Sequence, residues 1–565
     1  MSEKAKIEEI ERYKYNPREF FKRCKTIKAG FVPPILSLID ENGTLIYGPE
    51  IIVNKFKDYF KELLNTIPDN DNNDKETRAY YTVDQEVLAP SLDETKAAIH
   101  TLKNNKASGE DRINSEFWKI GGQEVERELH SVILQIWEEE RLPKSWKETL
   151  ICPIFKKGDR IKVKNYRGIT LLNTGYKVLS LIILKRLERY AEETVGEYQS
   201  GFRKGRSTTD HIFVVRQLME KHYEYAKDLH MVFVDYKQAY DREKLWEVLK
   251  TFGIPLKIIK MVQLCNSETY SKIKLGNEVS MAFEIKSGLK QGDAMSPILF
   301  NMALESVVRE MSDGDAWSPH RGLLLAYADD IIITGNTRTE VQMNLKKLMK
   351  ASKIENKEFE QVKEFKYLGV TLNNKNIMHE EINVRLNAAN RCYFAMETIF
   401  KSKLISKNVK EKLYLSYIRP VLTYACATWA TTKGDEEKLS RFERKILRRI
   451  HGPVFNTETQ QWELRSNAQL ENLYKRENNV QYIKSIRMQW AGHAWRAEGC
   501  LIKEIMTWTP TRKRPRGRPR RRWIDSVNEI WNAVGQEVRT NWQIIAQDRE
   551  KWEEIVLAVK ILNGS

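Results

Sequence analysis

The sequence has few cysteines, no long apolar run and no zinc-ligand pattern. Its six cysteines, in 565 residues, are widely scattered; none forms a Cys-x-x-Cys pair, and no histidine lies at zinc-knuckle spacing from them. Such cysteines are typical of an intracellular protein with reduced thiols and no structural zinc. No run of about 18 apolar residues occurs, so we expect no transmembrane helix and no membrane partner. The charged N-terminus, MSEKAKIEEIERYKYN, is unlike a signal peptide.

The composition favours a folded protein with a polyanionic partner. Hydrophobic residues make up 41% of the chain, which is enough for sizeable cores. The length corresponds to about three to four domains. Lys and Arg total 94 against 77 Asp and Glu, a net charge of +17. Without an apolar span, this excess favours nucleic acid over a membrane surface. At this point the alternative is a protein that is simply basic.

Changes in pattern along the chain predict its organisation. Residues 1–65 read as an N-terminal extension of helices around one strand-like segment, followed by a linker, 66–92, that begins TIPDNDNNDKETR. Strand-like runs then alternate with helices over 150–334, and a helical, basic region covers 380–450. A Trp-rich and Arg-rich segment ends the chain, and no internal repeat is present.

Two adjacent aspartates interrupt the apolar run LLLAYADDIIIT, residues 323–334. A buried carboxylate is costly unless it is paired or binds a metal. Asp329 and Asp330 therefore indicate either the polar tip of a hairpin or a metal site on that hairpin. Upstream, LHMVFVDYKQAYD contains a short apolar run, typical of a central buried strand, that ends in Asp235. If these strands are neighbours, their carboxylates suit two Mg²⁺ ions and an in-line phosphoryl displacement.

A glycine-containing loop lies between the two aspartate sites, in KSGLKQGDAMSPILFNMALE, residues 286–305. Gly288 and Gly292 allow the backbone to approach a ligand closely. Ser296 and Pro297 predict the start of a helix, with Ser as the N-cap and Pro at the first position. Alone, such a loop is weak evidence for a ligand site. Its position between the two aspartate sites makes this evidence stronger.

These motifs resemble the reverse transcriptases of non-LTR (LINE-class) retrotransposons. The matching segments, in the family's order, are LPKSWKETLICPIFKKGD, NYRGITLLN, YQSGFRKGRSTTDHIF, FVDYKQAYD, SGLKQGDAMSP, YADD and FKYLGVTL, followed by RCYFAMETIFKSKLISKNVKEKLYLSYIRPVLTYACATWA. The resemblance covers nearly the whole chain. It implies an α+β right-hand polymerase, with fingers and palm over 93–372, a helical thumb-like region over 373–455 and a basic, α-rich nucleic-acid-binding domain over 456–565.

The resemblance also implies an activity and its partners. The expected reaction is RNA-templated DNA synthesis from dNTPs at a primer 3′-hydroxyl, with two Mg²⁺ ions, or Mn²⁺ in their place. The expected partners are an RNA template and a nicked target DNA that serves as primer. The expected location is the nucleus, after a cytoplasmic ribonucleoprotein stage.

Roles for individual residues follow from the same resemblance. Asp235, Asp329 and Asp330 are the expected catalytic metal ligands. The expected dNTP-binding residues are the fingers cations Lys156, Lys157 and Arg167, the ribose-gating Tyr240, and Gln291 and Gly292 in the loop under the nascent base pair. Taken alone, the cations are surface charges and the tyrosine is an ordinary core residue.

The chain departs from the family in two places. It begins just before the polymerase, so we expect no endonuclease domain. After the helix that follows YADD, the family has a Gly-Leu turn and a strand ending in Lys-Thr-Lys, whose lysine is the expected general acid. Here VQMNLKKLMKASKIENKEFEQVKEF passes almost directly to the next hairpin, with Lys353 and Lys357 as the nearest lysines. The alternative function is a catalytically impaired, nucleic-acid-binding remnant.

Two basic segments are candidate nucleic-acid contacts. RFERKILRRIHGP, 441–453, is predicted to be helical, with its cations opposite Ile446 and Ile450. TRKRPRGRPRRR, 511–522, is predicted to be an extended ribbon that resembles the AT-hook core of minor-groove binders. The candidate contacts are Arg444, Arg448, Arg449, Arg514, Arg516, Gly517, Arg518 and Pro519. The alternatives are a solvated helix face for the first segment and a nuclear-import signal or a basic linker for the second.

Tryptophans are frequent in the C-terminal segment. They are Trp490, Trp495, Trp523, Trp531, Trp542 and Trp552. We expect them to form the core of a small domain rather than platforms on which bases stack.

Overall fold

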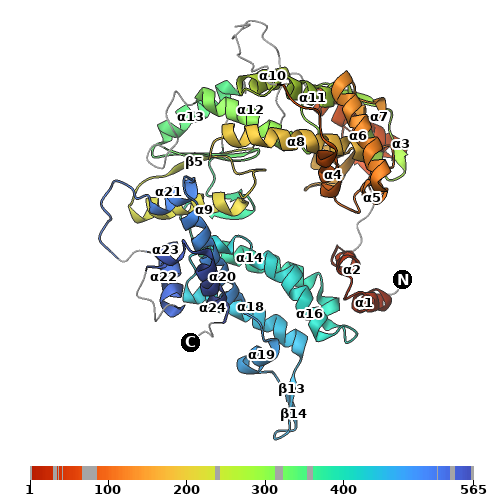
Figure 1. Ribbon diagram of the computed structural model, residues 1–565. Coiled ribbons are helices and arrows are strands. Elements are labelled where there is room, and N and C mark those ends of the chain that lie inside the picture. Colours follow the sequence, from red (N-terminus) through yellow and green to blue (C-terminus); the bar gives the residue numbers. More distant parts are fainter. Residues whose placement is uncertain are drawn as a thin grey trace.

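Helices alternate with short strands along the chain, which confirms the predicted α+β class (Figure 1). The computed structural model describes residues 3–29, 35, 37–40, 42–65, 86–235, 242–311, 322–352, 360–517, 520–534 and 541–561. All six cysteines are free, as expected. In these ranges, no helix combines the length and the apolar character that crossing a membrane requires.

A three-stranded antiparallel sheet lies at the centre of the molecule. Its strand order is β5 (His230–Asp235), β10 (Asp330–Gly335) and β9 (Leu324–Tyr327). Helices α12 (Ser296–Met311) and α13 (Arg338–Ala351) pack on one face and α9 (Thr208–Glu224) on the other, as Figure 1 shows.

Side chains of this sheet alternate between two hydrophobic clusters. Ile331 and Ile333 pack with α12 and α13, whereas Ile332 packs with α9. Successive side chains of a strand point to opposite faces. A strand covered on both faces therefore has a continuous apolar run, as both aspartate-bearing segments do.

A second sheet is formed by β3 (Glu148–Phe155), β4 (Tyr166–Leu171), β6 (Thr269–Leu275), β7 (Glu278–Val279) and β8 (Phe283–Ile285). Beside it, one continuous core joins the helices α4 (Leu92–Thr101), α6 (Gly122–Glu139), α8 (Thr174–Thr194), α10 (Arg242–Thr251), α11 (Leu256–Asn266) and α12. Helix α12 begins at Ser296, where the Ser-Pro pair predicts a helix start.

The first 65 residues contribute to two different cores. Helices α1 (Glu3–Arg12) and α2 (Pro17–Ala29) pack with helices from the second half of the chain, beside α16 (Lys407–Leu413). Helix α3 (Pro49–Leu63) instead packs on the second sheet, and a hairpin of β1 (Ser37–Ile39) and β2 (Leu45–Tyr47) precedes it. The sequence predicted one extension with one strand-like segment, whereas this part of the chain is divided between two units.

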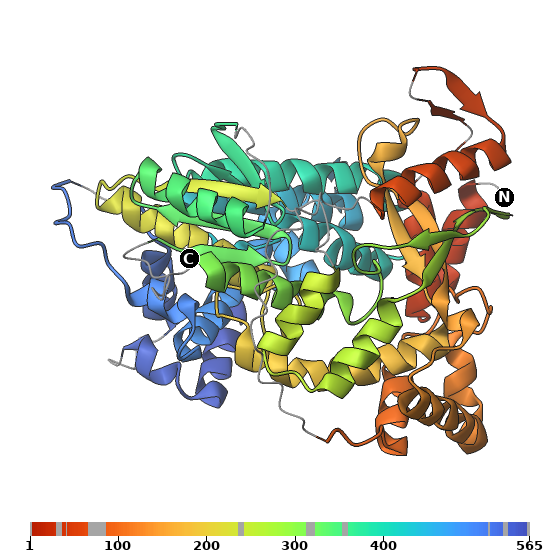
Figure 2. The ribbon, with the colours of Figure 1, turned by 90° about the horizontal axis from the view of Figure 1, so that it is seen from above.

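The C-terminal tryptophans are core residues, as predicted. Trp523, Trp531, Trp542 and Trp552 are buried on and around α22 (Trp523–Val534) and α24 (Arg549–Ile561), and Trp490 and Trp495 of α20 (Asn479–Arg496) pack against them. The same cluster contains residues of α9 and Ile332 of the central sheet. The C-terminal segment thus shares one core with the central sheet. Figure 2 shows its helices, in blue, on the side of the molecule opposite α3.

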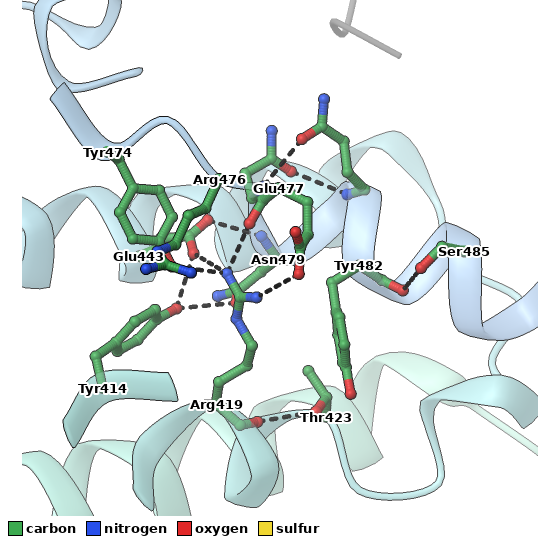
Figure 3. A network of polar contacts seen from close by, with 12 residues as sticks. Tyr414, Arg419, Thr423, Glu443, Tyr474, Arg476, Glu477, Asn479, Tyr482 and Ser485 are labelled. Carbon is green, nitrogen blue, oxygen red and sulfur yellow. Dashed lines mark hydrogen bonds and ion pairs between the residues drawn. The ribbon is translucent and has the colours of Figure 1, made fainter. Parts of the chain in front are cut away.

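A buried polar network joins three helices of the second half of the chain (Figure 3). Arg419 of α17 (Arg419–Leu422) lies 3.2 Å from Glu443 of α18 (Lys433–His451) and donates to the backbone carbonyl of Glu477 at 2.7 Å. Glu443 also accepts from the Tyr414 hydroxyl at 2.9 Å and from the Asn479 N–H at 2.7 Å. Burial raises the pKa of the Glu443 carboxyl, and these donors stabilise its charged form.

Candidate active site

Strand pairing brings the two aspartate sites together. Asp330, the first residue of β10, pairs in register with Asp235, the last residue of β5. This confirms the expectation that the two strands are neighbours. Tyr327 pairs with Asp330 on the other side, so Ala328 and Asp329 form a two-residue hairpin turn. The side chains of Asp329 and Asp330 are half-buried at this end of the sheet.

The turn itself has an unusual backbone conformation. Ala328 is buried and has a φ of 55°, in the left-handed region that residues with a Cβ seldom adopt. Two-residue hairpins favour such positive φ values, and glycine usually supplies them. The turn that carries Asp329 is therefore held by its surroundings rather than by local preference.

Aromatic residues lie around the turn. The Tyr367 hydroxyl of β11 (Glu364–Tyr367) is 3.2 Å from Nδ1 of His211, whose ring also contacts Tyr327 edge-on. Burial and the nearby charge of Asp330 raise the pKa of the Tyr367 hydroxyl. Burial lowers the pKa of His211 to about 3, so its imidazole is neutral at physiological pH.

The donor set at the turn consists of carboxylates, which suit Mg²⁺ or Mn²⁺. Among the described side chains, no group of three or more His, Cys, Asp or Glu is close enough to hold a metal ion. The side chain of Asp235 lies outside the described part of the structure. Asp329 and Asp330 thus fit the expected metals by their chemistry and by their half-exposed position.

The three expected fingers cations lie on one hairpin. Arg167 of β4 pairs with Ile154 of β3, and the Lys156 N–H donates to the Asn165 carbonyl where the strands diverge. Lys156, Lys157 and Arg167 are all exposed. The structure therefore groups these positive charges at one end of the β3–β4 hairpin.

The loop before α12 packs on the same hairpin. The Thr170 N–H of β4 donates to the Gln291 carbonyl at 2.9 Å. Gly292 has a φ of 116°, and a Cβ there would lie 2.9 Å from the Thr170 oxygen, so only glycine fits. Gln291 and Gly292 remain exposed. They contact β4 at Thr170, three residues along the strand from Arg167.

Two groups that fix this part of the molecule were not singled out from the sequence. Asp293 is buried and accepts from the Tyr176 hydroxyl at 2.5 Å and from the Ser180 hydroxyl, so it anchors the loop to α8. Gln199 is buried and accepts from the Ala328 N–H at 2.9 Å. Both lie inside motifs that the sequence does contain, KQGD and YQSGF, but nothing local shows which groups they contact. Tyr240 lies outside the described residues.

The basic helix has the predicted arrangement but begins earlier. Helix α18 starts at Lys433, after a capping box formed by Thr432 and Asp435. Its Ile446 and Ile450 are buried, Arg444 is half-buried and Arg449 is exposed. Arg448 donates to the Arg465 carbonyl at 3.2 Å and to the Asn467 side chain at 2.8 Å, so it holds the segment that follows the helix.

The basic ribbon has no regular structure over 511–517, as predicted. Arg514 and Arg522 each lie 3.2 Å from Glu224 at the end of α9. Arg516 is exposed, next to Gly517 with a φ of 138°. Arg518 and Pro519 lie outside the described residues. The end of α9 therefore already neutralises part of the ribbon's charge.

Comparisons with known proteins agree with this geometry. Residues 154–372 match the family described as reverse transcriptase (RNA-dependent DNA polymerase). The chain is 25% identical over 331 residues to the transposon TX1 uncharacterized 149 kDa protein of Xenopus laevis, covering 56% of this chain and 25% of that protein. It is 23% identical over 414 residues to the RNA-directed DNA polymerase from mobile element jockey of Drosophila melanogaster, covering 64% and 44%.

Two further similarities are weaker. The chain is 25% identical over 200 residues to the Pol polyprotein from the type-1 retrotransposable element R2 of Popillia japonica, covering 34% of this chain and 28% of that protein. A solved structure of apo telomerase from Candida tropicalis, truncated from its C-terminal domain, covers 48% of this chain and 62% of that chain at 14% identity and a TM-score of 0.32. This chain spans less than half the length of the TX1, jockey and R2 proteins.

The matched range has clear limits in the structure. It begins within β3, next to the expected fingers cations, and ends in β12 (Val370–Asn373), the partner of β11. Between these limits lie the loop of Gln291 and Gly292 and the paired Asp235 and Asp330. The chain therefore carries a reverse transcriptase domain related to those of non-LTR retrotransposons.

Proposed function

We propose that this chain is an RNA-directed DNA polymerase of a non-LTR retrotransposon, which adds dNTPs to a primer 3′-hydroxyl. The observation that carries the proposal is the register of Asp235 with Asp330, beside the turn of Asp329, inside the matched domain. Convergent carboxylates at the end of a sheet are what nucleotidyl transfer with two metal ions requires.

Asp235, Asp329 and Asp330 are the proposed ligands of two Mg²⁺ ions, which Mn²⁺ can replace. When bound, such ions lower the pKa of the attacking hydroxyl and stabilise charge on the transferred phosphate. The protein's part is to hold the carboxylates at the open end of the sheet. The strand pairing fixes Asp330, and the hairpin turn fixes Asp329.

The dNTP is proposed to lie against the β3–β4 hairpin. Lys156, Lys157 and Arg167 supply positive charge for its triphosphate, and arginine can bind a phosphate through two hydrogen bonds. Gln291 and Gly292 are proposed to lie under the nascent base pair, since their loop is fixed to β4 yet exposed. Tyr240 is proposed to exclude a ribose 2′-hydroxyl.

The remaining assignments concern larger parts of the chain. Residues 93–372 are the proposed fingers and palm, 373–455 the thumb-like region and 456–565 a nucleic-acid-binding region. An RNA template and a DNA primer are the proposed partners, in the nucleus, and the net charge of +17 supports a polyanionic partner.

One observation favours the alternative function, a binding remnant without polymerase activity. Among the described residues, β5 pairs with β10 on one side and with no strand on the other. The resemblance to the family implies a strand ending in Lys-Thr-Lys at that edge. Here Phe365 of β11 stacks on Phe233 of β5, with ring centroids 4.1 Å apart. Within the described residues, the β11–β12 hairpin thus covers the sheet by side-chain packing but adds no strand to it.

A primer-extension assay tests the proposal and separates the two functions. The purified chain is given a DNA primer annealed to an RNA template, with dNTPs and Mg²⁺, and a chelator is added in a parallel reaction. The proposal predicts extension that the chelator abolishes. Binding of the template–primer without extension supports the remnant. In that case, inserting the missing turn and strand of a relative between Lys353 and Ile354 should restore synthesis.

A further inference from the structure

We infer that Gln199 is a positioning residue for the catalytic turn, because its side chain fixes the backbone that carries Asp329. The inference rests on the proposed function for its kinetic consequence, but its structural part stands independently. Gln199 lies in the YQSGF motif, far along the chain from the turn.

The segment around Gln199 lies beside β9 and is joined to it by an isolated β-bridge. The Ala326 N–H donates to the Tyr198 carbonyl at 2.8 Å, and the Ser200 N–H donates to the Ala326 carbonyl at 3.0 Å. Together these bonds form a parallel bridge between Gln199 and Ala326. The segment therefore lies along β9 up to the point where the turn begins.

The carboxamide oxygen of Gln199 joins the segment to the turn. It accepts from the Ala328 N–H at 2.9 Å and from the Gly201 N–H at 2.8 Å. Gln199 is fully buried, and its amide nitrogen has no hydrogen-bond partner among the described residues. Within that part of the structure, only the oxygen is used.

The turn depends on this bond because its conformation is strained. Ala328 has a φ of 55°, and the left-handed region costs an alanine about 1–2 kcal/mol. The ladder pairs Tyr327 with Asp330, so it does not hold the Ala328 N–H. A strained conformation persists only where the surroundings over-determine it. Without the hydrogen bond to the Gln199 oxygen, the turn that contains Asp329 is free to relax.

The segment is itself anchored, so it can act as a fixed support. The Tyr198 hydroxyl and the Gly196 N–H both donate to Glu305 of α12, at 2.7 and 2.9 Å. The Gly201 carbonyl accepts from the Asn301 amide of the same helix at 2.8 Å. A Cβ at Gly201 would lie 2.3 Å from the Ala328 nitrogen, so the two backbones are too close for any residue but glycine at this position.

Substitution at Gln199 tests this role. Gln199→Met keeps the length of the side chain but removes the acceptor, whereas Gln199→Glu keeps an acceptor oxygen in either protonation state. Ser200→Ala is the matched control, because it leaves the backbone bridge and the Gln199 oxygen in place. The two readouts are amide hydrogen exchange of the peptide that spans residues 324–331, measured on the full chain without nucleotide, and steady-state primer extension.

Gln199→Met should expose the Ala328 amide to exchange and lower kcat about 10- to 100-fold, because small misplacements of reacting groups have effects of this size. Its KM for dNTP and its template–primer affinity should change little. Gln199→Glu should restore both the protection and most of kcat, and Ser200→Ala should match the unsubstituted chain. A general role in folding would instead lower the protection of the β3–β4 hairpin together with that of the turn.

The result that overturns the inference is unchanged protection of the turn in Gln199→Met, or equal loss of kcat in the Met and Glu variants. Exchange of the β3–β4 hairpin serves as the internal reference for folding. If Gln199→Met also loses protection in the β3–β4 hairpin, Gln199→Asn is measured instead, because its side chain is too short to bring an oxygen to Ala328. If the unsubstituted chain never extends a primer, the proposed function fails, and the exchange result alone decides the inference.

Discussion

Asp330 lies directly opposite Asp235 across the β10–β5 pair, at the end of both strands. Antiparallel pairing places the last residue of one strand beside the first residue of the other, so the two aspartate motifs meet without any contribution from a loop. The hairpin turn then adds Asp329 at the same end of the sheet. The geometry of the proposed catalytic site thus follows from the register of two apolar strands.

Removing a fingers cation should weaken dNTP binding. Arg167→Ala or Lys156→Ala should raise the KM for dNTP roughly tenfold or more, because a hydrogen bond to a charged group contributes about 1.5–3 kcal/mol. Lys164→Ala is the control, since this exposed cation lies in the same hairpin but outside the proposed site. Steady-state extension at varied dNTP concentration measures the effect. An equal change in the control would reduce the three cations to general surface charge.

Substitutions in the basic ribbon should affect duplex DNA binding unequally. Arg516→Gln should lower the affinity and reduce the slope of log K against log salt by about 0.9, because one phosphate contact is lost. Arg514→Gln should have a smaller effect, since Glu224 already pairs with Arg514. Fluorescence anisotropy on A·T-rich and G·C-rich duplexes measures both. Equal effects of the two substitutions would contradict the pairing of Arg514 with Glu224. If binding shows no preference for A·T-rich duplexes, the ribbon acts only as a patch of positive charge.

Arg419 should be important for stability. Arg419→Met leaves the buried Glu443 carboxylate without its ion-pair partner, which costs about 3–5 kcal/mol of unfolding free energy. Arg441→Met breaks the exposed pair with Glu437 and should cost less than about 1 kcal/mol. Urea unfolding of both variants provides the comparison. Equal losses would mean that the network in Figure 3 adds no more than a surface pair.

Glu220 should make the stability depend on pH. Burial raises its pKa from 4.5 to about 7, and its carboxylate accepts from the Trp523 N–H. Between about pH 4.5 and 7 the folded chain keeps a proton that the unfolded chain releases, so the free energy of unfolding falls as the pH rises through this range. Glu220→Gln should remove this fall. Melting temperatures at several pH values, which should diverge between the two proteins, test the prediction; parallel curves would contradict it.

Much of the candidate site could be predicted from the sequence because its signals are local. Continuous apolar runs ending in aspartate predict buried strands, and the spacing of Ile446 and Ile450 predicts the covered face of the basic helix. The match of residues 154–372 to the reverse transcriptase family, together with the similarity to the TX1 and jockey proteins, confirms the resemblance that these motifs suggest.

Other features depend on contacts between distant segments and have no local signal. The division of the first 65 residues between two cores and the pairing of Arg514 with Glu224 are both of this kind. So is the approach of Gln199 to Ala328, since glutamine is usually a surface residue and only the tertiary arrangement buries it here.

The most direct test of the central claim is incorporation of a single dNTP opposite an RNA template, by the full chain and by Asp329→Asn. The substitution keeps the shape of the side chain but removes the charge of a proposed metal ligand. The account predicts Mg²⁺-dependent incorporation by the unsubstituted chain, and a loss of orders of magnitude in the variant with template–primer affinity unchanged. Equal incorporation by both proteins, or binding without incorporation by either, would contradict it.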